Sequence, residues 1–214
     1  MNSSDVIAAG TPRLVLASTS VYRRQLLERL GLPFATSRPE VDESARAGED
    51  AQALTGRLAR AKAEAVALQH PGSIIIGSDQ LATCGGRMLG KPGSEERAVE
   101  QLRSLSGARV IFNTAVHVMH SGTSRARLVE GQQETGLAET HMDTTTVYFR
   151  LLSDEEIQRY VARERPLDCA GGFKAEGLGI SLFERIESQD PTGLIGLPLI
   201  WLAGALRRQG FALP

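Results

Sequence analysis

The sequence predicts an α/β fold in which a mixed central sheet is flanked by helices. Apolar strands alternate with amphipathic helices along the whole chain of 214 residues, so a mixed sheet is expected. The isoleucine run at 74–76 has the composition of a strand buried on both faces. No internal repeat or low-complexity linker divides the chain. Its length fits one domain, or one domain with two lobes.

The first part of the chain predicts two strands and two helices. The apolar stretch 14–17 is the first strand, and the hydroxyl residues after it cap a helix at 22–30, which ends at a glycine. A short strand follows at 34–37. The acidic stretch 39–50 predicts a loop, and the stretch 51–68 predicts a helix with one apolar face.

The middle of the chain predicts two strands around one helix. The isoleucine strand covers 73–77 and continues at 81–83, and two glycines then form a turn. Ser94 is the expected N-cap of a helix at 94–105 that carries two glutamates in its first turn. The stretch 108–119 has the composition of a strand.

The last part predicts a hairpin, strands and two helices. The polar, glycine-rich stretch 120–140 predicts a hairpin with a loose tip, and a strand follows at 144–150. An acidic start marks a helix at 153–163. The stretch 178–186 predicts a strand pair or a bent strand. A proline in the first turn marks a final helix at 198–209.

Composition and charge exclude several classes of function. The net charge is -1, and the sequence lacks the basic stripe or tail that nucleic-acid-binding proteins carry. No apolar run reaches the ~18 residues that span a membrane, and the N-terminus lacks the pattern of a signal peptide. Cys84 and Cys169 are too few for a disulfide scaffold and have no zinc-site spacing. We therefore expect a cytoplasmic protein with reduced thiols that binds neither nucleic acid nor a membrane.

The first candidate site is the turn between the first strand and the first helix. Arg23 and Arg24 lie at the start of the helix, where cations are disfavoured because that end is already positive. A bound anion would explain them, since free N–H groups, the Ser18 hydroxyl and the guanidinium groups would converge on phosphate. The alternative is a simple serine cap beside solvated arginines.

Carboxylates and a lysine form further candidates. Asp79 follows the isoleucine strand, and ligands of open α/β sheets collect at the carboxyl ends of strands. The acidic loop carries Glu43 among other carboxylates that could hold Mg²⁺, which prefers oxygen ligands. Lys91 lies on a turn without the glycine spacing of a P-loop. The alternatives are an aspartate that starts a turn, a solvated loop and a solvated lysine.

A glycine-rich segment at 169–179 carries Lys174 and Glu176. Glycines let the backbone approach a ligand closely, and residues two apart in an extended segment share a face. The alternative is a loop with surface charges. The four histidines have no ligand-like spacing, and we expect them at the surface.

Taken in order, these segments resemble the Maf family of nucleotide pyrophosphatases. The resemblance rests on an ordered set of short motifs and predicts a single domain at 13–214 after an extension at 1–12. The motifs are Leu16-Ala17-Ser18-Thr19-Ser20 with Arg23-Arg24, Arg57-Leu58-Ala59 with Lys62-Ala63, Gly77-Ser78-Asp79-Gln80, Gly90-Lys91-Pro92, Leu105-Ser106-Gly107, Phe149-Arg150, Phe173-Lys174-Ala175-Glu176-Gly177 and Gly196-Leu197-Pro198.

The resemblance implies Mg²⁺- or Mn²⁺-dependent hydrolysis of a nucleoside triphosphate to the monophosphate and pyrophosphate. It also implies a two-lobed fold like that of the inosine triphosphatase group, with the site in a cleft, and homodimers are frequent in the family. The residues that it implies as phosphate ligands are Ser18, Arg23, Arg24, Lys62 and Lys91. Glu43 and Asp79 would place the metal, and Asp79 would orient or deprotonate the attacking water. Lys174 would lie elsewhere in the cleft.

In the family that this chain resembles, three positions are associated with the choice of substrate. In this chain they are Tyr22, Gln80 and Glu176. The branch that acts on 7-methyl-GTP carries an aromatic residue, Gln and Glu, whereas the branch that acts on dTTP and UTP carries Arg, Thr and Gln. This chain carries Tyr, Gln and Glu at these positions and so resembles the first branch. An aromatic face and a carboxylate would both favour the cationic base of 7-methyl-GTP. The alternatives are a dTTP/UTP pyrophosphatase, a nucleotide-binding regulator without turnover, and an enzyme that acts on sugar phosphates.

Overall fold

A computed structural model describes residues 12–122 and 138–214. Within them the chain forms one sheet of seven strands in the order β2-β1-β3-β5-β6-β7, and β4 pairs with β3. The strands are β1 (Arg13–Ala17), β2 (Phe34–Ser37), β3 (Ser73–Cys84), β4 (Arg87–Leu89), β5 (Arg109–His120), β6 (Glu139–Phe149) and β7 (Phe183–Glu187). β1 runs parallel to β2 and β3, and the other pairs are antiparallel. The predicted mixed sheet is confirmed.

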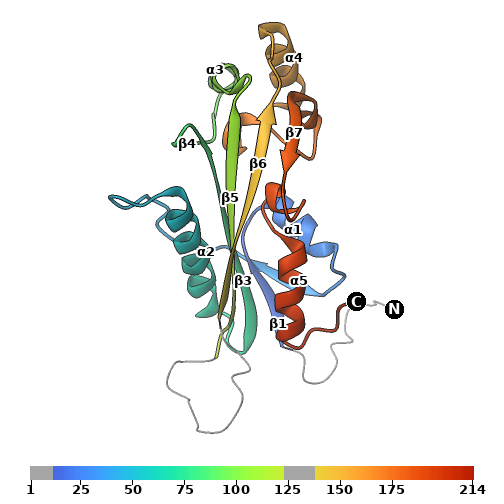
Figure 1. Ribbon diagram of the computed structural model, residues 1–214. Coiled ribbons are helices and arrows are strands. Elements are labelled where there is room, and N and C mark those ends of the chain that lie inside the picture. Colours follow the sequence, from blue (N-terminus) through green and yellow to red (C-terminus); the bar gives the residue numbers. More distant parts are fainter. Residues whose placement is uncertain (1–11, 123–137) are drawn as a thin grey trace.

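The helices lie in two halves of the molecule that share the long strands β3, β5 and β6 (Figure 1). The α-helices are α1 (Val21–Glu28), α2 (Ala51–Ala67), α3 (Glu95–Leu105), α4 (Asp154–Glu164) and α5 (Leu199–Arg208), and the short 3₁₀ helices are η1 (Ala170–Gly172), η2 (Leu178–Leu182) and η3 (Gly193–Ile195). One half contains α1, α2 and α5 with β1 and β2. The other contains α3 and α4 with β4 and β7. These halves correspond to the two predicted lobes.

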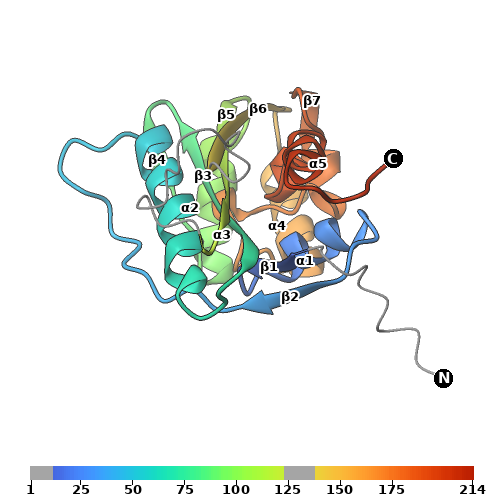
Figure 2. The ribbon, with the colours of Figure 1, turned by 90° about the horizontal axis from the view of Figure 1, so that it is seen from below.

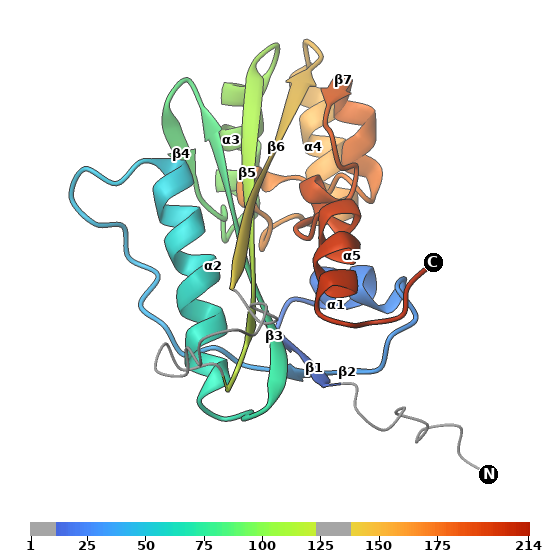
Figure 3. The same ribbon diagram turned by 60° about the horizontal axis from the view of Figure 1, so that its bottom comes forward.

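In the first half, helices cover both faces of the sheet (Figures 2 and 3). Ile75 packs against Ala63 and Val66 of α2. Its neighbours Ile74 and Ile76 point to the other face, into the core formed with α1 and α5. Each of the three isoleucines has an exposed fraction of 0%. The uninterrupted apolar run is therefore explained by burial on both faces, as the sequence predicted.

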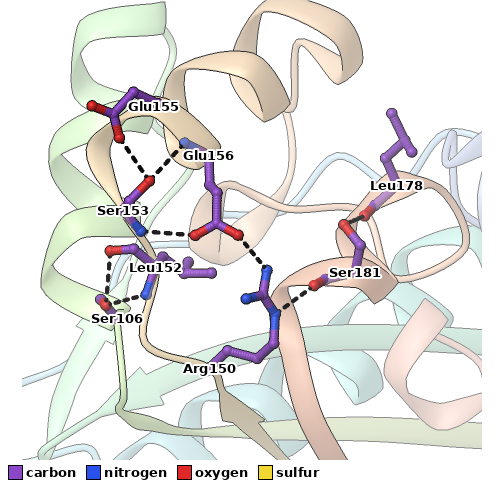
Figure 4. Close-up of polar contacts among 8 residues, drawn as sticks. All are labelled: Ser106, Arg150, Leu152, Ser153, Glu155, Glu156, Leu178 and Ser181. Atoms are coloured by element: carbon purple, nitrogen blue, oxygen red, sulfur yellow. Dashed lines mark hydrogen bonds and ion pairs between the residues drawn. The ribbon is translucent and has the colours of Figure 1, made fainter.

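Serine side chains cap the N-termini of α1, α3 and α4, at the residues expected from the sequence. In α4, Ser153 and Glu156 form a capping box. Figure 4 shows that Arg150 extends this arrangement, because its Nε donates to the Ser181 carbonyl at 2.9 Å and its Nη2 donates to Glu156 at 3.1 Å. Arg150 therefore ties the end of β6 to α4 and η2.

The predicted strand pair at 178–186 is wrong in its first part, where η2 replaces it, and only β7 is extended. The cause is a close approach of two backbone segments. A Cβ on Gly179 would lie 2.3 Å from the carbonyl oxygen of Lys174. The chain folds back on itself too tightly there for a strand.

Parts of two predictions lie outside the described residues. The predicted hairpin at 120–140 falls mostly within 123–137, and the predicted extension at 1–12 falls mostly within 1–11. β5 and β6, which flank residues 123–137, pair as antiparallel strands. Among the helices in the described ranges, none is both long and apolar enough to cross a membrane.

The prediction that the histidines lie at the surface is wrong for His117. Its exposed fraction is 3%, and its Nδ1 lies 2.7 Å from the Thr140 hydroxyl on the neighbouring strand. Burial, together with the charge of Arg60, lowers the pKa of His117 to about 4. His141 is also partly covered, because its ring stacks on Trp201 with the ring centroids 4.9 Å apart.

The low pKa of His117 predicts a loss of stability on mild acidification. The unfolded chain takes up this proton near pH ~6.5, whereas the folded chain does so only at about 4. The stabilising contribution is therefore present above pH ~6.5 and is lost as the pH falls from there toward 4. Chemical denaturation of the wild type and of His117→Gln between pH 7 and about 5 should show a shallower fall in the variant. Equal slopes would contradict this role of His117.

Candidate active site

Lys62 of α2 lies between two carboxylates, Asp79 and Glu43. Its Nζ is 2.7 Å from Asp79 Oδ1 and 2.7 Å from Glu43 Oε1. Lys62 and Asp79 are buried, whereas the Glu43 side chain is 63% exposed on its loop. The Lys62 ammonium therefore balances the charges of two carboxylates. Asp79 lies at the buried end of this group, and Glu43 lies at its solvent-exposed end.

The contact between Lys62 and Asp79 depends on how closely α2 approaches β3. Gly77 lies on the face of β3 that meets α2, and a Cβ there would be 2.1 Å from the carbonyl oxygen of Ala59. Only glycine allows this approach, which brings the α2 side chain to the strand residue two positions further on.

Arg23 reaches the same group from α1. Its Nε donates to the Gly196 carbonyl at 3.0 Å, and the Ser78 hydroxyl donates to that carbonyl at 2.9 Å. Burial lowers the pKa of the Arg23 guanidinium, and the nearby charges of Asp79 and Glu43 act against this effect. The structure thus brings Arg23, which the sequence indicated as a phosphate ligand, close to Asp79 and Glu43, which the sequence singled out separately.

The turn before α1 is ordered by its own hydroxyl groups. The Ser18 Oγ accepts from the backbone N–H of Ser20 at 3.1 Å, and Ser18 is buried. Arg24, in contrast, points to the other side of α1 and pairs with Glu28 at 3.4 Å, with both side chains 54% exposed. A phosphate contact of Arg24 stays a prediction.

Lys91 acts on the same site from the turn after β4. The hydrogen bond from Lys62 is the main cause of the lowered pKa of Glu43, and the charges of Lys62, Lys91 and Arg23 add to it. Three cations therefore favour the ionised form of this one exposed carboxylate. They come from α1, from α2 and from the loop after β4, and thus from both halves of the molecule.

A second cluster joins α1 to the glycine-rich segment. Cys169, Asp168 and Glu176 lie near enough to the Tyr22 hydroxyl to act on it electrostatically. Burial and, to a smaller extent, these neighbours together raise the pKa of Tyr22 to about 12. Tyr22 directly precedes Arg23, so α1 contributes one residue to this cluster and one to the group around Lys62.

From the sequence, Cys169 was considered only as a reduced thiol at the start of the glycine-rich segment, and Asp168 was not considered. Their only signal was their position at the start of the glycine-rich segment. That segment is anchored by Phe173, whose ring makes edge-to-face contacts with Phe112, Phe149 and Phe183 at centroid distances of 5.1–5.4 Å.

Two other predicted residues make structural contacts. The Gln80 Nε2 lies 2.9 Å from each of three oxygens, the Thr114 hydroxyl and the carbonyls of Gly193 and Leu194. The Lys174 Nζ donates to the carbonyl of Glu164 at 3.1 Å and lies 3.8 Å from the Glu164 carboxylate. Gln80 therefore fixes η3 and Lys174 fixes the end of α4. Their contacts with a substrate stay predictions.

The carboxylate pair fits a hard divalent cation that arrives with a phosphate ligand. Within residues 12–122 and 138–214, no three His, Cys, Asp or Glu side chains are grouped so that they could hold a metal by themselves. Glu43 and Asp79 nevertheless converge on one positively charged atom. Mg²⁺ is commonly held by one or two carboxylates together with substrate phosphates and water.

The fold and this site define an α/β protein that combines a strand–turn–helix carrying a buried arginine with paired carboxylates. Residues 13–209 match the family described as Maf-like protein, and the chain belongs to this family.

Relatives from several bacteria match nearly the whole chain. This chain is 54% identical to a 7-methyl-GTP pyrophosphatase of Xanthomonas oryzae pv. oryzae, and the match covers 95% of this chain and 100% of that protein. It is 48% identical to a 7-methyl-GTP pyrophosphatase of Pseudomonas aeruginosa, again over 95% and 100%. Among solved structures, the Ham1 protein of Staphylococcus aureus aligns with a TM-score of 0.48 at 15% identity, over 91% of this chain and 98% of that one.

Proposed function

We propose that this protein is a nucleoside triphosphate pyrophosphatase that hydrolyses 7-methyl-GTP to 7-methyl-GMP and pyrophosphate. The observation that carries the proposal is the convergence of Arg23, Lys62 and Lys91 on the carboxylates Glu43 and Asp79. Tyr22, which shares α1 with Arg23, has the acidic neighbours Asp168 and Glu176, and this combination supports a cationic base as ligand. Relatives with about half of their residues identical are named for this activity.

In this reaction one water molecule attacks the α-phosphorus, the α–β anhydride bond breaks, and pyrophosphate leaves. Arg23, Lys62 and Lys91 neutralise charge on the triphosphate and on the leaving pyrophosphate. Asp79, which lies within β3 and not at the carboxyl end of a strand as the sequence predicted, orients the water and accepts its proton. Glu43 and Asp79 would hold Mg²⁺ or Mn²⁺, which supplies charge neutralisation at the phosphates when bound.

The test is pyrophosphate release from a panel of nucleotides, with Mg²⁺, with Mn²⁺ and with EDTA. The panel contains 7-methyl-GTP, GTP, dTTP and UTP. The proposal expects the highest kcat/KM for 7-methyl-GTP and loss of activity in EDTA. Binding without pyrophosphate release in every condition would instead identify a nucleotide-binding regulator. A preference for dTTP or UTP would place the protein in the other branch of the family.

Glu176 should decide between guanine and uracil. Its carboxylate can accept from the N1–H and the N2 amine of guanine, whereas a glutamine side chain loses the charge and gains a donor. Glu176→Gln should lower the ratio of kcat/KM for 7-methyl-GTP to that for UTP by ~10-fold. Glu184→Gln, at an exposed position of β7, is the matched control and should keep the wild-type ratio. If Glu176→Gln also kept it, the base-recognition role of Glu176 would be wrong.

We further propose a homodimer in the cytoplasm, an expectation that rests on the family resemblance and on the reduced cysteines. Light scattering on the purified protein tests the oligomeric state, and cell fractionation tests the location.

A further inference from the structure

The buried carbonyl of Gly196 connects strand β3 to the arginine of the candidate active site. Two side chains donate to it, the Ser78 hydroxyl at 2.9 Å and the Arg23 Nε at 3.0 Å. Among the described residues, no backbone N–H donates to this carbonyl. A carbonyl oxygen has two lone pairs and can accept two hydrogen bonds. Ser78 and Arg23 therefore share one acceptor, although they come from different elements.

The short helix η3, which Gly196 follows, is held against the sheet at both ends. At its start, the Gly193 carbonyl accepts from the Gln80 Nε2 and from the Thr114 hydroxyl, each at 2.9 Å. Ser78 and Gln80 are two residues apart in β3 and so lie on the same face of the sheet. The sheet thus fixes η3, and Ser78 holds the end that contacts Arg23.

The backbone at Gly196 also packs directly on the arginine. Gly196 has a φ of +119°, in the left-handed region that glycine adopts without strain. A Cβ at this position would lie 3.3 Å from the Arg23 Nε and 3.7 Å from its Cγ. A change in the direction of the Gly196 carbonyl would therefore move the Arg23 side chain.

The rest of the Arg23 guanidinium is available to an anion. Within residues 12–122 and 138–214, the bond from Nε is the only hydrogen bond of this side chain, and the guanidinium takes part in no ion pair. The guanidinium is a rigid planar fork, so the position of Nε sets the direction in which both Nη groups point. A two-point contact with phosphate depends on that direction.

Ser78 and its neighbour Asp79 serve opposite faces of β3. The Asp79 carboxylate accepts from Lys62 of α2, whereas the Ser78 hydroxyl donates toward η3, and Ser78 has an exposed fraction of 0%. Adjacent residues of a paired strand cannot move independently. Ser78 therefore links the position of Arg23 to the strand that carries the carboxylate proposed to activate water.

We propose that Ser78 is a positioning residue for the triphosphate, because it fixes the Gly196 carbonyl and this carbonyl orients Arg23 toward the phosphates. The inference rests on the proposed function, in which Arg23 binds the triphosphate. Ser78 acts only through Arg23 and does not touch the substrate. A purely structural hydroxyl would contribute to the stability of the fold and not to the phosphate contact.

The test is a double-mutant cycle between Ser78 and Arg23, with inorganic pyrophosphate as the probe. Calorimetry without metal measures the affinity, and melting curves show which variants are folded. Ser78→Ala should weaken binding by ~5-fold. In Arg23→Met, which lacks the guanidinium, the further change Ser78→Ala should have no effect. Ser73→Ala, at another buried position of β3, is the matched control and should bind like the wild type.

Ser78→Cys is a second variant in case alanine disturbs the strand. A thiol is similar in size to a hydroxyl but is a weaker donor, so the affinity should lie between those of the wild type and Ser78→Ala. The inference is overturned if the folded Ser78 variants bind pyrophosphate as tightly as the wild type. It is also overturned if Ser78→Ala weakens binding equally with and without Arg23.

Turnover separates this inference from the proposed function. A wild type that binds pyrophosphate but hydrolyses no triphosphate would refute the proposed function, and the coupling between Ser78 and Arg23 would still decide the inference. A wild type that binds no pyrophosphate would overturn the inference. In the active enzyme, Ser78→Ala should raise KM for 7-methyl-GTP and for GTP by the same factor, because the phosphate contact changes and the base contact does not.

Discussion

Replacing Asp79 by Asn should lower kcat by ~100-fold or more while the protein stays folded. The Asp79 carboxylate accepts from Lys62 at 2.7 Å and is buried at the end of the site. An asparagine fills the same space and can still accept from Lys62, but it cannot take a proton from water and is a poorer metal ligand. The measurement is single-substrate kinetics with 7-methyl-GTP at saturating Mg²⁺, together with a melting curve.

Asp154→Asn is the matched control, because Asp154 is an exposed aspartate whose partner is Arg103 on the surface. It should keep kcat within ~2-fold, since surface ion pairs contribute little. Near-normal turnover of Asp79→Asn at saturating metal would show that Asp79 neither binds the metal nor activates water.

Gly77→Ala should destabilise the fold by roughly 3 kcal/mol or more. The new Cβ would lie 2.1 Å from the carbonyl oxygen of Ala59 and 2.8 Å from the backbone nitrogen of Ala63. Both are main-chain atoms of α2, so no side-chain rotation relieves the contact and the whole helix has to shift. Chemical denaturation measures the loss in the free energy of unfolding.

The contrasting variant is Gly56→Ala in the same helix. A Cβ there would meet only the end of the Met142 side chain at 3.9 Å, which is an ordinary contact. Because alanine favours helix over glycine, this variant should be stabilised by up to ~1 kcal/mol. If Gly77→Ala were as stable as the wild type, α2 would not be held against β3 by the backbone contact described here.

Gly77→Ala also connects stability to activity. Lys62 reaches Asp79 only because α2 lies against this glycine. A shift of α2 by ~1 Å would separate the two charges and misplace a catalytic group, which is enough to lower the rate strongly.

Local sequence signals predicted most of the secondary structure. The isoleucines at 74–76 indicated a strand buried on both faces, and Ser94 and Ser153 marked the starts of helices, because composition and capping act over a few residues. The failure at 178–182 has a long-range cause, since Gly179 packs on the backbone of Lys174. His117 is similar, because its burial depends on the pairing of strands distant in sequence.

The candidate site was predictable in its residue types but less so in its contacts. Arg23 and Arg24 are equivalent as sequence, yet one points to the carboxylates and the other pairs with Glu28 on the exposed side of α1. The side to which a residue of a short helix points depends on where that helix packs. The neighbouring residues in the sequence do not determine this. Cys169 came together with Tyr22 only because two distant segments meet in space.

The strands β3, β5 and β6, which run through both halves, limit how this molecule can move and how it can be divided. Rotation of one half against the other requires a linker between them with few backbone hydrogen bonds. Here the two halves are instead joined by continuously paired strands of one sheet. Glu43 lies on the loop at 38–50, so a movement of this loop would change the carboxylate pair without bending the sheet. For protein engineers, expressing either half alone would expose long unpaired strand edges, so we expect the two halves to unfold together.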